Sequence, residues 1–507
     1  MDDLGVPDIL RLPHVSEASL LHSLRVRYGR EEIYTTAGPV LLSINPYKWY
    51  PEAYSEERML EYSSNGGADM ADTGMAADEE PHLFQVAHRA YHAMTKSAST
   101  LLLSSQQSQD QSIIISGESG AGKTEATKII MQYLARITQK DHDQAVDSNE
   151  EIDEVSLEKR VLASNPLLET FGNAKTLKND NSSRFGKFIQ IQFKHDQITG
   201  MLLFVDFVCY IVQFLYPIIL KTFTNKGASI HNYLLEKTRV IHQINGERNY
   251  HIFYQLLSSK QLSSSLLLDS KQTYKYLSSA STSKPTKGDA MALEETKSSL
   301  NRIGLAEEQV SSIWAIVASV LHLGNVALAS PSSSSESQEE NLHCTLLDES
   351  PLQNVAHLLQ IEYEMLWTSF TEKKLHLPNN KVIVQPLNVT QAIDKRDALA
   401  KFLFENLFVW LVRRLNANLG GSGSGESCIG ILDIYGFEHF TINTLSQLLI
   451  NYANESLQHQ FNAYLFQQEQ ALYEEEGVNW EYVEYRDNSG ILALLQGTLP
   501  LKIYLTT

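Results

Sequence analysis

The sequence predicts an α/β fold in which helices flank a twisted, mostly parallel central sheet and a largely helical upper subdomain follows. Three patterns lead to this prediction. The segment Gly117–Thr124 reads GESGAGKT, and it joins the apolar run Ile113–Ile115 to the helix-compatible stretch Glu125–Ala135. Apolar and polar residues alternate over 189–193, and the short apolar run 428–432 is typical of a buried strand. Helical spacing of apolar residues dominates the second half of the chain.

The first elements follow in order from the N-terminal end. Leu20–Tyr28 has apolar spacing suited to a short helix, and Ile33–Ile44 predicts strands. A helix that carries Val86, Ala90 and Met94 on one face is expected next. Further helices are predicted at four places: 247–257, 309–323, 392–415 and 443–473. Polar or glycine-rich composition predicts loops or a flexible joint at three places: 63–78, 139–154 and 420–425.

The glycine-rich segment Gly117–Thr124 is the motif that carries the most chemistry. Its glycines let the backbone curl so that several N–H groups point inward at an anion. Lys123 adds a positive charge, and the helix that starts there adds the positive end of its dipole. A plain glycine turn is the alternative reading, but the flanking strand and helix disfavour it. We therefore expect this loop to hold a nucleoside triphosphate.

Length and charge narrow the class of protein. At 507 residues with 43% hydrophobic content, the chain can form two or more cooperating subdomains with filled cores. Its net charge of −19 argues against a nucleic-acid binder, because its field would repel a polyanion. Cys209, Cys344 and Cys428 have no metal-ligand spacing, so neither zinc nor a disulfide is expected. Met1 is followed by acidic residues and not by a secretory leader, which predicts a cytoplasmic protein.

Five segments around this loop resemble, in order and approximate spacing, the myosin motor head. They are LLSINPYKWYPEAY at 41–54 (the purine-binding loop), GESGAGKTEATK at 117–128 (the phosphate loop), NDNSSRFGKFIQIQF at 179–193 (the first switch), LDIYGFEHF at 432–440 (the second switch) and the run 450–488 (the relay helix and loop). The resemblance covers most of residues 15–490. It implies a P-loop ATPase of the actin-based motors, associated with the cytoskeleton and using ATP and Mg²⁺.

The resemblance also implies a domain organisation for residues 1–490 as a partial motor domain. The nucleotide-binding core would occupy about 30–260 and 427–440, the helical upper subdomain about 260–420, and the relay helix about 443–474.

By the same resemblance, individual residues receive expected roles. Residues expected to bind the nucleotide are Asn45, Pro46, Tyr47, Tyr54, Gly117, Glu118, Ser119, Gly120, Ala121, Gly122, Lys123, Thr124 and Asn179. Thr124 and Ser183 would ligate Mg²⁺ through their hydroxyls, and Asp433 would hold a magnesium-bound water. Lys123, Ser182 and the backbone N–H of Gly436 would surround the γ-phosphate. Arg184 and Glu438 would form a bridge that closes over the nucleotide and gates hydrolysis.

An apolar stretch interrupts the resemblance at residues 201–226. Three explanations are open: a translated intron, an insert packed against the head, or a membrane anchor over 201–220, which is about the length of a span. The first is favoured, because a span there would put switch I and Tyr233 on opposite sides of a bilayer. Binding to a membrane is therefore not expected unless 201–220 is a true span.

Other departures concern the end of the chain and two single positions. Residues 489–507 lose the resemblance, and the converter and lever that follow in the family do not appear, so actin binding is expected to be weakened and motion along actin absent. Trp49 stands where many family members carry a basic residue, and Lys381 where an acidic or phosphorylatable residue is common. A non-catalytic truncated product or scaffold that binds nucleotide weakly is the alternative to an ATPase.

Overall fold

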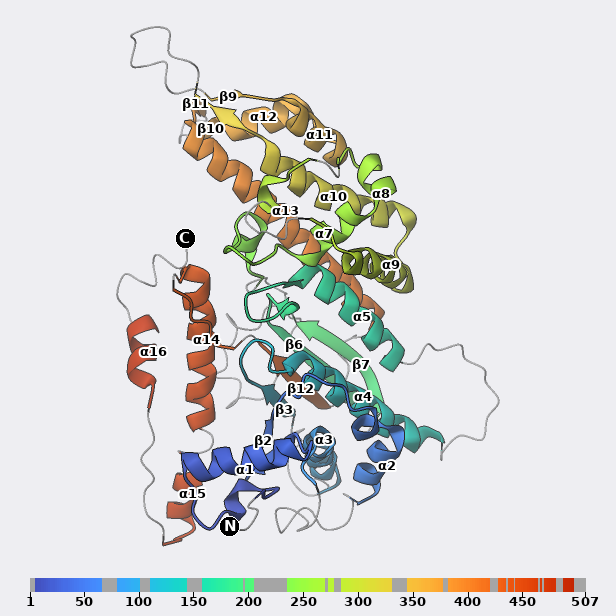
Figure 1. Ribbon diagram of the computed structural model, residues 1–507, viewed down its shortest axis with the longest axis vertical. Helices are drawn as coiled ribbons and strands as arrows, with labels where there is room; N and C mark the ends of the chain where they lie inside the picture. The colour runs from blue at the N-terminus through green and yellow to red at the C-terminus, as the bar shows by residue number, and fades with distance from the viewer. Residues whose placement is uncertain are drawn as a thin grey trace.

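The computed structural model, shown in Figure 1, describes residues 5–65, 80–100, 110–143, 157–194, 197–204, 235–269, 272–277, 284–330, 344–376, 382–419, 427–434, 436–441, 443–463, 466, 469–479 and 487–496. A part that contains the central sheet and a part made mostly of helices follow each other along the longest axis of the molecule (Figure 1).

The central sheet has four described strands in the order β3, β12, β6, β7. Their bounds are β3 (Gln111–Ile115), β12 (Ser427–Asp433), β6 (Lys187–Lys194) and β7 (Gln197–Phe204). β12 runs parallel to β3 but antiparallel to β6, and β6 runs antiparallel to β7. The prediction of a mostly parallel sheet is wrong for these strands, which form a mixed sheet. β6 and β7 follow each other too closely for a crossover, and so short a connection can join only antiparallel neighbours.

The alternating pattern over 189–193 is confirmed as a strand with one fully buried face. Ile189, Ile191 and Phe193 are all less than 4% exposed. The run Ile113–Ile115 is less uniform, because Ile113 is buried whereas Ile114 is 53% exposed. β3 therefore has only one covered face, although its last three residues are all isoleucine.

Helices α3 (Leu83–Thr100) and α4 (Lys123–Asp143) pack on each other and on strands β3 and β12. α5 (Leu157–Gly172) packs against α4 and leads into the short β4 (Asn173–Ala174), which pairs with β5 (Ser182–Ser183). α4 continues through the first residues of 139–154, where a loop was predicted, and residues 144–156 lie outside the described part.

The N-terminal part is built from small elements, whose bounds are η1 (Ile9–Arg11), α1 (Glu17–Gly29), β1 (Tyr34–Ala37), β2 (Val40–Ser43), η2 (Pro51–Tyr54) and α2 (Glu56–Asn65). The predicted helix at 20–28 and the strands at 33–44 are confirmed by α1 and by the β1–β2 hairpin. Ser16 begins α1 with a capping box, since its hydroxyl accepts from the Ser19 N–H.

The upper part is largely helical, as predicted. Its helices are η3 (Lys237–Val240), α7 (His251–Ser258), α8 (Lys260–Ser265), η4 (Lys275–Leu277), α9 (Lys287–Arg302), α10 (Glu307–Asn325), α11 (Ser350–Leu359), α12 (Tyr363–Thr371) and α13 (Val389–Asn418). Two small hairpins accompany them, β8 (Leu328–Ala329) with β9 (Thr345–Leu346) and β10 (Glu372–His376) with β11 (Val382–Pro386). One apolar core continues from Ile33 through the sheet to Leu419 at the end of α13, so the helical and sheet-containing parts share it.

The chain after the sheet forms α14 (Leu445–Asn462), α15 (Glu469–Glu475) and α16 (Ser489–Gln496). The single helix predicted over 443–473 is thus described as two helices, and part of the segment between them lies outside the described residues. α16 packs on α14, and Asn488 donates to the Glu455 carboxylate at 2.6 Å. The segment that loses the motif resemblance at 489 therefore begins as a helix docked on α14.

The apolar stretch 201–226 is only partly described. Met201–Phe204 complete β7 and pair with β6, so these four residues belong to the sheet. Residues 205–234, which include Cys209, lie outside the described part, as do Lys381 and the joint 420–425. Among the helices that the structure describes, none combines the length and the apolar character that crossing a bilayer requires.

Gly172, the last residue of α5, offers a test of packing between the sheet-containing part and the upper helices. A methyl group added there would lie 2.4 Å from the buried ring of Phe185, which packs edge-on against Phe408. We expect Gly172→Ala to lower the free energy of unfolding by about 1–3 kcal/mol, measured by urea denaturation. Gly29→Ala is the matched control, because a methyl group at Gly29 meets nothing within 4 Å. Equal effects of the two substitutions would contradict this packing.

Candidate active site

The loop that follows β3 forms a tight cradle around the side chain of Lys123. Gly120 and Gly122 have φ of 85° and 93°, values that favour glycine. The Lys123 ammonium donates to the backbone carbonyls of Gly117 at 2.7 Å and Glu118 at 2.8 Å. Burial lowers the pKa of Lys123, while the carboxylates of Asp433 and Glu118 act against that shift. The loop thus encloses the positive charge of Lys123 at the start of α4, as the motif predicts.

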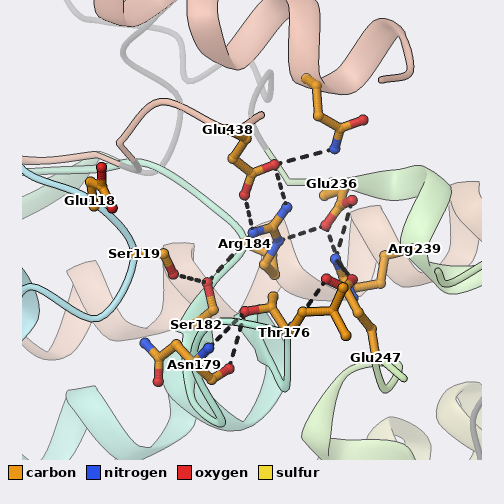
Figure 2. Close-up of polar contacts among 12 residues, drawn as sticks. Glu118, Ser119, Thr176, Asn179, Ser182, Arg184, Glu236, Arg239, Glu247 and Glu438 are labelled. Carbon is orange, nitrogen blue, oxygen red and sulfur yellow. Dashed lines mark hydrogen bonds and ion pairs between the residues drawn. The ribbon is translucent and has the colours of Figure 1, made fainter. Parts of the chain in front are cut away.

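The segment 179–184 lies beside this loop. The hydroxyls of Ser119 and Ser182 are 3.1 Å apart, and Ser182 belongs to β5. The side chain of Asn179 lies 3.8 Å from the position that a Cβ on Gly120 would take. Asn179 is held by its own turn, because its N–H donates to the Thr176 hydroxyl at 3.2 Å. Figure 2 shows Ser119, Ser182, Asn179 and Thr176 in this arrangement.

Asp433, at the end of β12, meets both α4 and β6. The Thr124 hydroxyl donates to its carboxylate at 3.2 Å, and the Lys187 ammonium lies 3.0 Å from the same oxygen. Lys187 is directly opposite Asp433 in the antiparallel β12–β6 register. Lys187 was not among the predicted site residues. A charged residue at the start of a buried strand does indicate that an oppositely charged residue lies nearby. Thr124 and Asp433, two of the three residues predicted to hold magnesium, are thus in contact, and the third, Ser183, lies half-buried on β5 next to Ser182.

Gly436 lies against the glycine-rich loop itself. A Cβ at this position would be 2.1 Å from the Gly117 carbonyl oxygen and 2.9 Å from the Glu118 Cα. No side chain fits there without moving the backbone of the loop. The segment after β12 therefore packs directly on the residues that follow β3.

Arg184 and Glu438 form the predicted bridge, although 254 positions separate them in the sequence. Nη1 of Arg184 lies 2.5 Å from Oε1 of Glu438, and Nη2 lies 3.2 Å from Oε2, so the contact is bidentate. Arg184 is 1% exposed and Glu438 is 6% exposed. Burial alone would lower the pKa of Arg184, but Glu236 and Glu438 raise it well above its ordinary value. In a buried site, such a fork-to-carboxylate pair also excludes water.

Two side chains of α14 hold Glu438 from the other side. The Gln447 amide donates to the Glu438 carboxylate at 3.2 Å. Asn451 accepts from the Glu438 N–H at 2.9 Å and donates to its carbonyl at 2.8 Å. The position of this helix next to the site was predicted from the sequence, but its contacts with Glu438 were not. Both residues lie on one face of α14, four positions apart, which is the spacing that could have singled them out.

A second acidic partner of Arg184, Glu236, was also missed. It lies 2.7 Å from Nε of Arg184 and 2.5 Å from Nε of Arg239. Arg239 in turn lies 2.8 Å from Glu247, which is 1% exposed. Figure 2 shows the chain of contacts from Glu438 through Arg184 and Glu236 to Arg239 and Glu247. These charges occur between 236 and 248 in the sequence, but no motif spacing indicated which of them would meet Arg184.

The loop 45–54 adjoins the other side of the phosphate loop. The Asn45 amide donates to the Gly120 carbonyl at 2.7 Å, and its oxygen accepts from the Tyr47 N–H at 2.9 Å. Tyr47 is 84% exposed and has a φ of 50°. Tyr54 donates to or accepts from the Tyr34 hydroxyl at 2.8 Å, and Trp49 stacks on its ring at 4.9 Å. Of the residues predicted to contact the base, Asn45 is thus tied directly to the loop.

Pro46 is half-buried next to Asn45, and Ala121 lies within the loop, where its N–H donates to the Glu118 carbonyl at 3.1 Å. The predicted site residues therefore converge from four separate segments. These segments are 45–54, 117–124, 179–184 and 433–438.

The donors and acceptors that meet here suit a triphosphate with a magnesium ion. The half-buried ammonium of Lys123 and the left-handed glycine backbone fit phosphate oxygens. The hydroxyls of Thr124 and Ser183 with the carboxylate of Asp433 are the hard oxygen ligands that magnesium prefers. Because Gly436 has no side chain, its backbone lies against the loop, and its N–H would be close to the phosphate oxygens.

Comparison with known proteins agrees with this arrangement. The sequence pattern of the family Myosin head (motor domain) matches residues 6–203 and 218–503. The unmatched residues 204–217 fall inside the apolar stretch 201–226, and the match extends through most of 489–507.

Curated relatives come from distant organisms. The chain is 35% identical to Myosin-51 of Schizosaccharomyces pombe, 37% identical to the Myosin-I heavy chain of Dictyostelium discoideum and 36% identical to unconventional myosin-Vb of Mus musculus. These alignments cover 97%, 97% and 98% of this chain but only 30%, 18% and 24% of the relatives. The chain thus spans less than a third of the length of these relatives. Since the matched ranges include all four segments that converge on the site, the chain belongs to the myosin head (motor domain) family.

Proposed function

We propose that this chain binds ATP and hydrolyses it to ADP and phosphate in the presence of magnesium, as the nucleotide-binding part of an actin-based motor. The observation that carries the proposal is the buried bridge between Arg184 and Glu438. It joins two segments that also touch the phosphate loop, through Ser182 and Gly436. We propose that closure of this kind keeps bulk water out and holds an attacking water in position.

Lys123 and the loop backbone are the proposed phosphate-binding groups. The Lys123 ammonium now donates to two loop carbonyls, and it would turn a short way to reach β- and γ-phosphate oxygens. Ser119, Gly120 and Gly122 would contribute N–H groups to the same oxygens. Asn179 lies beside Gly120 and would contact the phosphates from the opposite side.

Magnesium, when bound, would neutralise charge on the β- and γ-phosphate oxygens. Thr124 and Ser183 are the residues proposed to hold it, with Asp433 acting through a water. Lys187 pairs with the buried Asp433 carboxylate at 3.0 Å and fixes its position, so Asp433 is suited to orient a water.

Cleavage needs the terminal phosphate and the attacking water to be aligned. The Ser182 hydroxyl, the Lys123 ammonium and the Gly436 N–H are proposed to surround the phosphoryl group as the bond to ADP breaks. Arg184 and Glu438 are proposed to hold the water behind it. Because Gln447 and Asn451 of α14 contact Glu438, a movement of this segment would be passed to the helix.

The purine is proposed to contact Asn45, Pro46, Tyr47 and Tyr54. Asn45 is hydrogen-bonded to Gly120, so this loop is next to the phosphates. Binding to actin filaments is proposed from family membership.

The proposal is tested by measuring phosphate release from ATP by the 507-residue chain. We expect turnover that requires magnesium, and addition of EDTA in excess should lower it at least about 100-fold, since the charged phosphates then remain unneutralised. Labelled ATP in a filter-binding assay reports affinity separately. A folded chain that takes up ATP but releases no phosphate would favour the alternative of a non-catalytic nucleotide binder.

A further inference from the structure

Glu236 lies beside Arg184 and contacts a different nitrogen of its guanidinium from the two that face Glu438. Its carboxylate is 2.7 Å from Nε of Arg184, and its side chain is 10% exposed. Glu236 is the residue before η3, and it belongs to neither of the two segments that form the Arg184–Glu438 bridge. Glu236 therefore makes a contact with the Arg184 guanidinium that is separate from the two made by Glu438.

The two carboxylates use different edges of the Arg184 guanidinium. Glu438 accepts from Nη1 and Nη2, whereas Glu236 accepts from Nε. A planar guanidinium held along two edges cannot rotate about the end of its side chain without breaking a charge-assisted hydrogen bond. Figure 2 shows Arg184 between the two glutamates.

Glu236 is itself firmly held. Arg239 donates to it from Nε at 2.5 Å and from Nη2 at 3.4 Å. The Glu236 N–H donates to the Arg184 carbonyl at 3.0 Å, and the Tyr250 hydroxyl donates to the Glu236 carbonyl at 3.0 Å. Arg239 is fixed by Glu247 at 2.8 Å. The carboxylate that faces Arg184 therefore has a defined position.

Charge balance gives Glu236 a second role. Arg184 and Arg239 are buried on either side of it, and it is the carboxylate that both guanidiniums share. Burial by itself would raise the pKa of Glu236, but the two arginines outweigh burial and hold that pKa below its ordinary value. If this charge were removed, the two guanidiniums would repel each other in a buried place.

We propose that Glu236 is a positioning residue for ATP cleavage: it sets the orientation of Arg184 so that the guanidinium meets Glu438 edge to edge. This inference rests on the proposed function. The orientation of the bridge then depends on a residue that lies outside the phosphate loop and outside both segments that the bridge joins. Glu236 itself would touch neither the nucleotide nor the attacking water.

The test compares ATP affinity with the rate of cleavage in the 507-residue chain. We expect Glu236→Gln to slow single-turnover cleavage about 10- to 100-fold, because a small misplacement of Arg184 is enough for such a loss. Affinity for labelled ATP should stay within about threefold, since Glu236 does not face the phosphate loop. Glu236→Asp keeps the charge and should recover part of the rate.

A double substitution separates positioning from a general effect on the fold. In a Glu438→Ala background the bridge is absent, so adding Glu236→Asp, which keeps a carboxylate beside the buried Arg184, should change the cleavage rate less than about twofold. Glu405→Gln is the matched control, because Glu405 pairs with Lys237, the residue next to Glu236, at 2.6 Å. This control should leave both affinity and cleavage unchanged.

Two results would overturn the inference. One is wild-type cleavage in Glu236→Gln; the other is a loss that persists in full in the Glu438→Ala background. If Glu236→Gln yields no folded protein, ATP affinity and single-turnover cleavage are measured on Glu236→Asp instead, and wild-type cleavage would again overturn the inference. A wild-type chain that binds ATP but does not cleave it would instead defeat the proposed function, so the two failures are distinguishable.

Discussion

We expect Glu438→Ala to slow ATP cleavage at least about 100-fold, equivalent to about 2.7 kcal/mol of activation free energy, while ATP affinity changes less than about threefold. The reason is the location of the carboxylate. Glu438 accepts both Nη groups of Arg184, and it lies outside the phosphate loop whose backbone would bind the nucleotide. Single-turnover cleavage and equilibrium binding of labelled ATP check the two parts of this prediction.

The structure also indicates why this variant should fold. Arg184 would keep Glu236 as a partner at 2.7 Å, so its buried charge would not be left alone. The backbone of residue 438 would still be held by Asn451, whose contacts do not involve the carboxylate. Glu405→Ala serves as the matched control, since it removes a glutamate that pairs with Lys237 away from the site. Parallel losses of affinity and cleavage in Glu438→Ala would refute the gating role.

The second large effect is expected at Lys123. We expect Lys123→Ala to weaken ATP binding at least about 100-fold, or about 2.7 kcal/mol, because the half-buried ammonium is the positive charge that the loop encloses. The substitution also removes the ammonium that donates to the carbonyls of Gly117 and Glu118, of which the Glu118 carbonyl still accepts from the Ala121 N–H. Isothermal titration with ATP and magnesium measures the change directly.

Lys297→Ala provides the comparison for this variant. Lys297 lies on α9, pairs with Glu294 on the surface and is 37% exposed, so the same substitution removes a solvated charge. Its affinity for ATP should equal that of the wild type. Retention of ATP by Lys123→Ala at wild-type affinity would mean that the loop does not bind the phosphates in the proposed way.

The phosphate loop and its flanking elements could be predicted from the sequence, because its chemistry is contiguous. A strand, a glycine turn and a helix start are local features, and the structure has them as β3, the loop and α4. The long helices were predicted for the same reason: apolar spacing within one segment reports its own buried face. The predicted range 392–415, for example, lies within α13.

The pairing of Arg184 with Glu438 was also predicted, but through resemblance to a known family and not from spacing. Nothing local connects two residues 254 positions apart. The sheet shows the limit of local patterns, because apolar runs at 113–115 and 428–432 indicate strands but not their direction. The mixed topology is seen only in the structure, where β12 runs parallel to β3 and antiparallel to β6.

By itself, then, the amino-acid sequence determined the local chemistry of this protein: the glycine loop with Lys123, the strands and helices that carry each motif, and membership of a family. Only the tertiary structure decided which charges meet. The β12–β6 register places Lys187 opposite Asp433, and the packing of η3 brings Glu236 beside Arg184. Such contacts depend on strand register and on the burial of segments far apart in sequence, and a buried charge takes whichever partner the fold brings within reach.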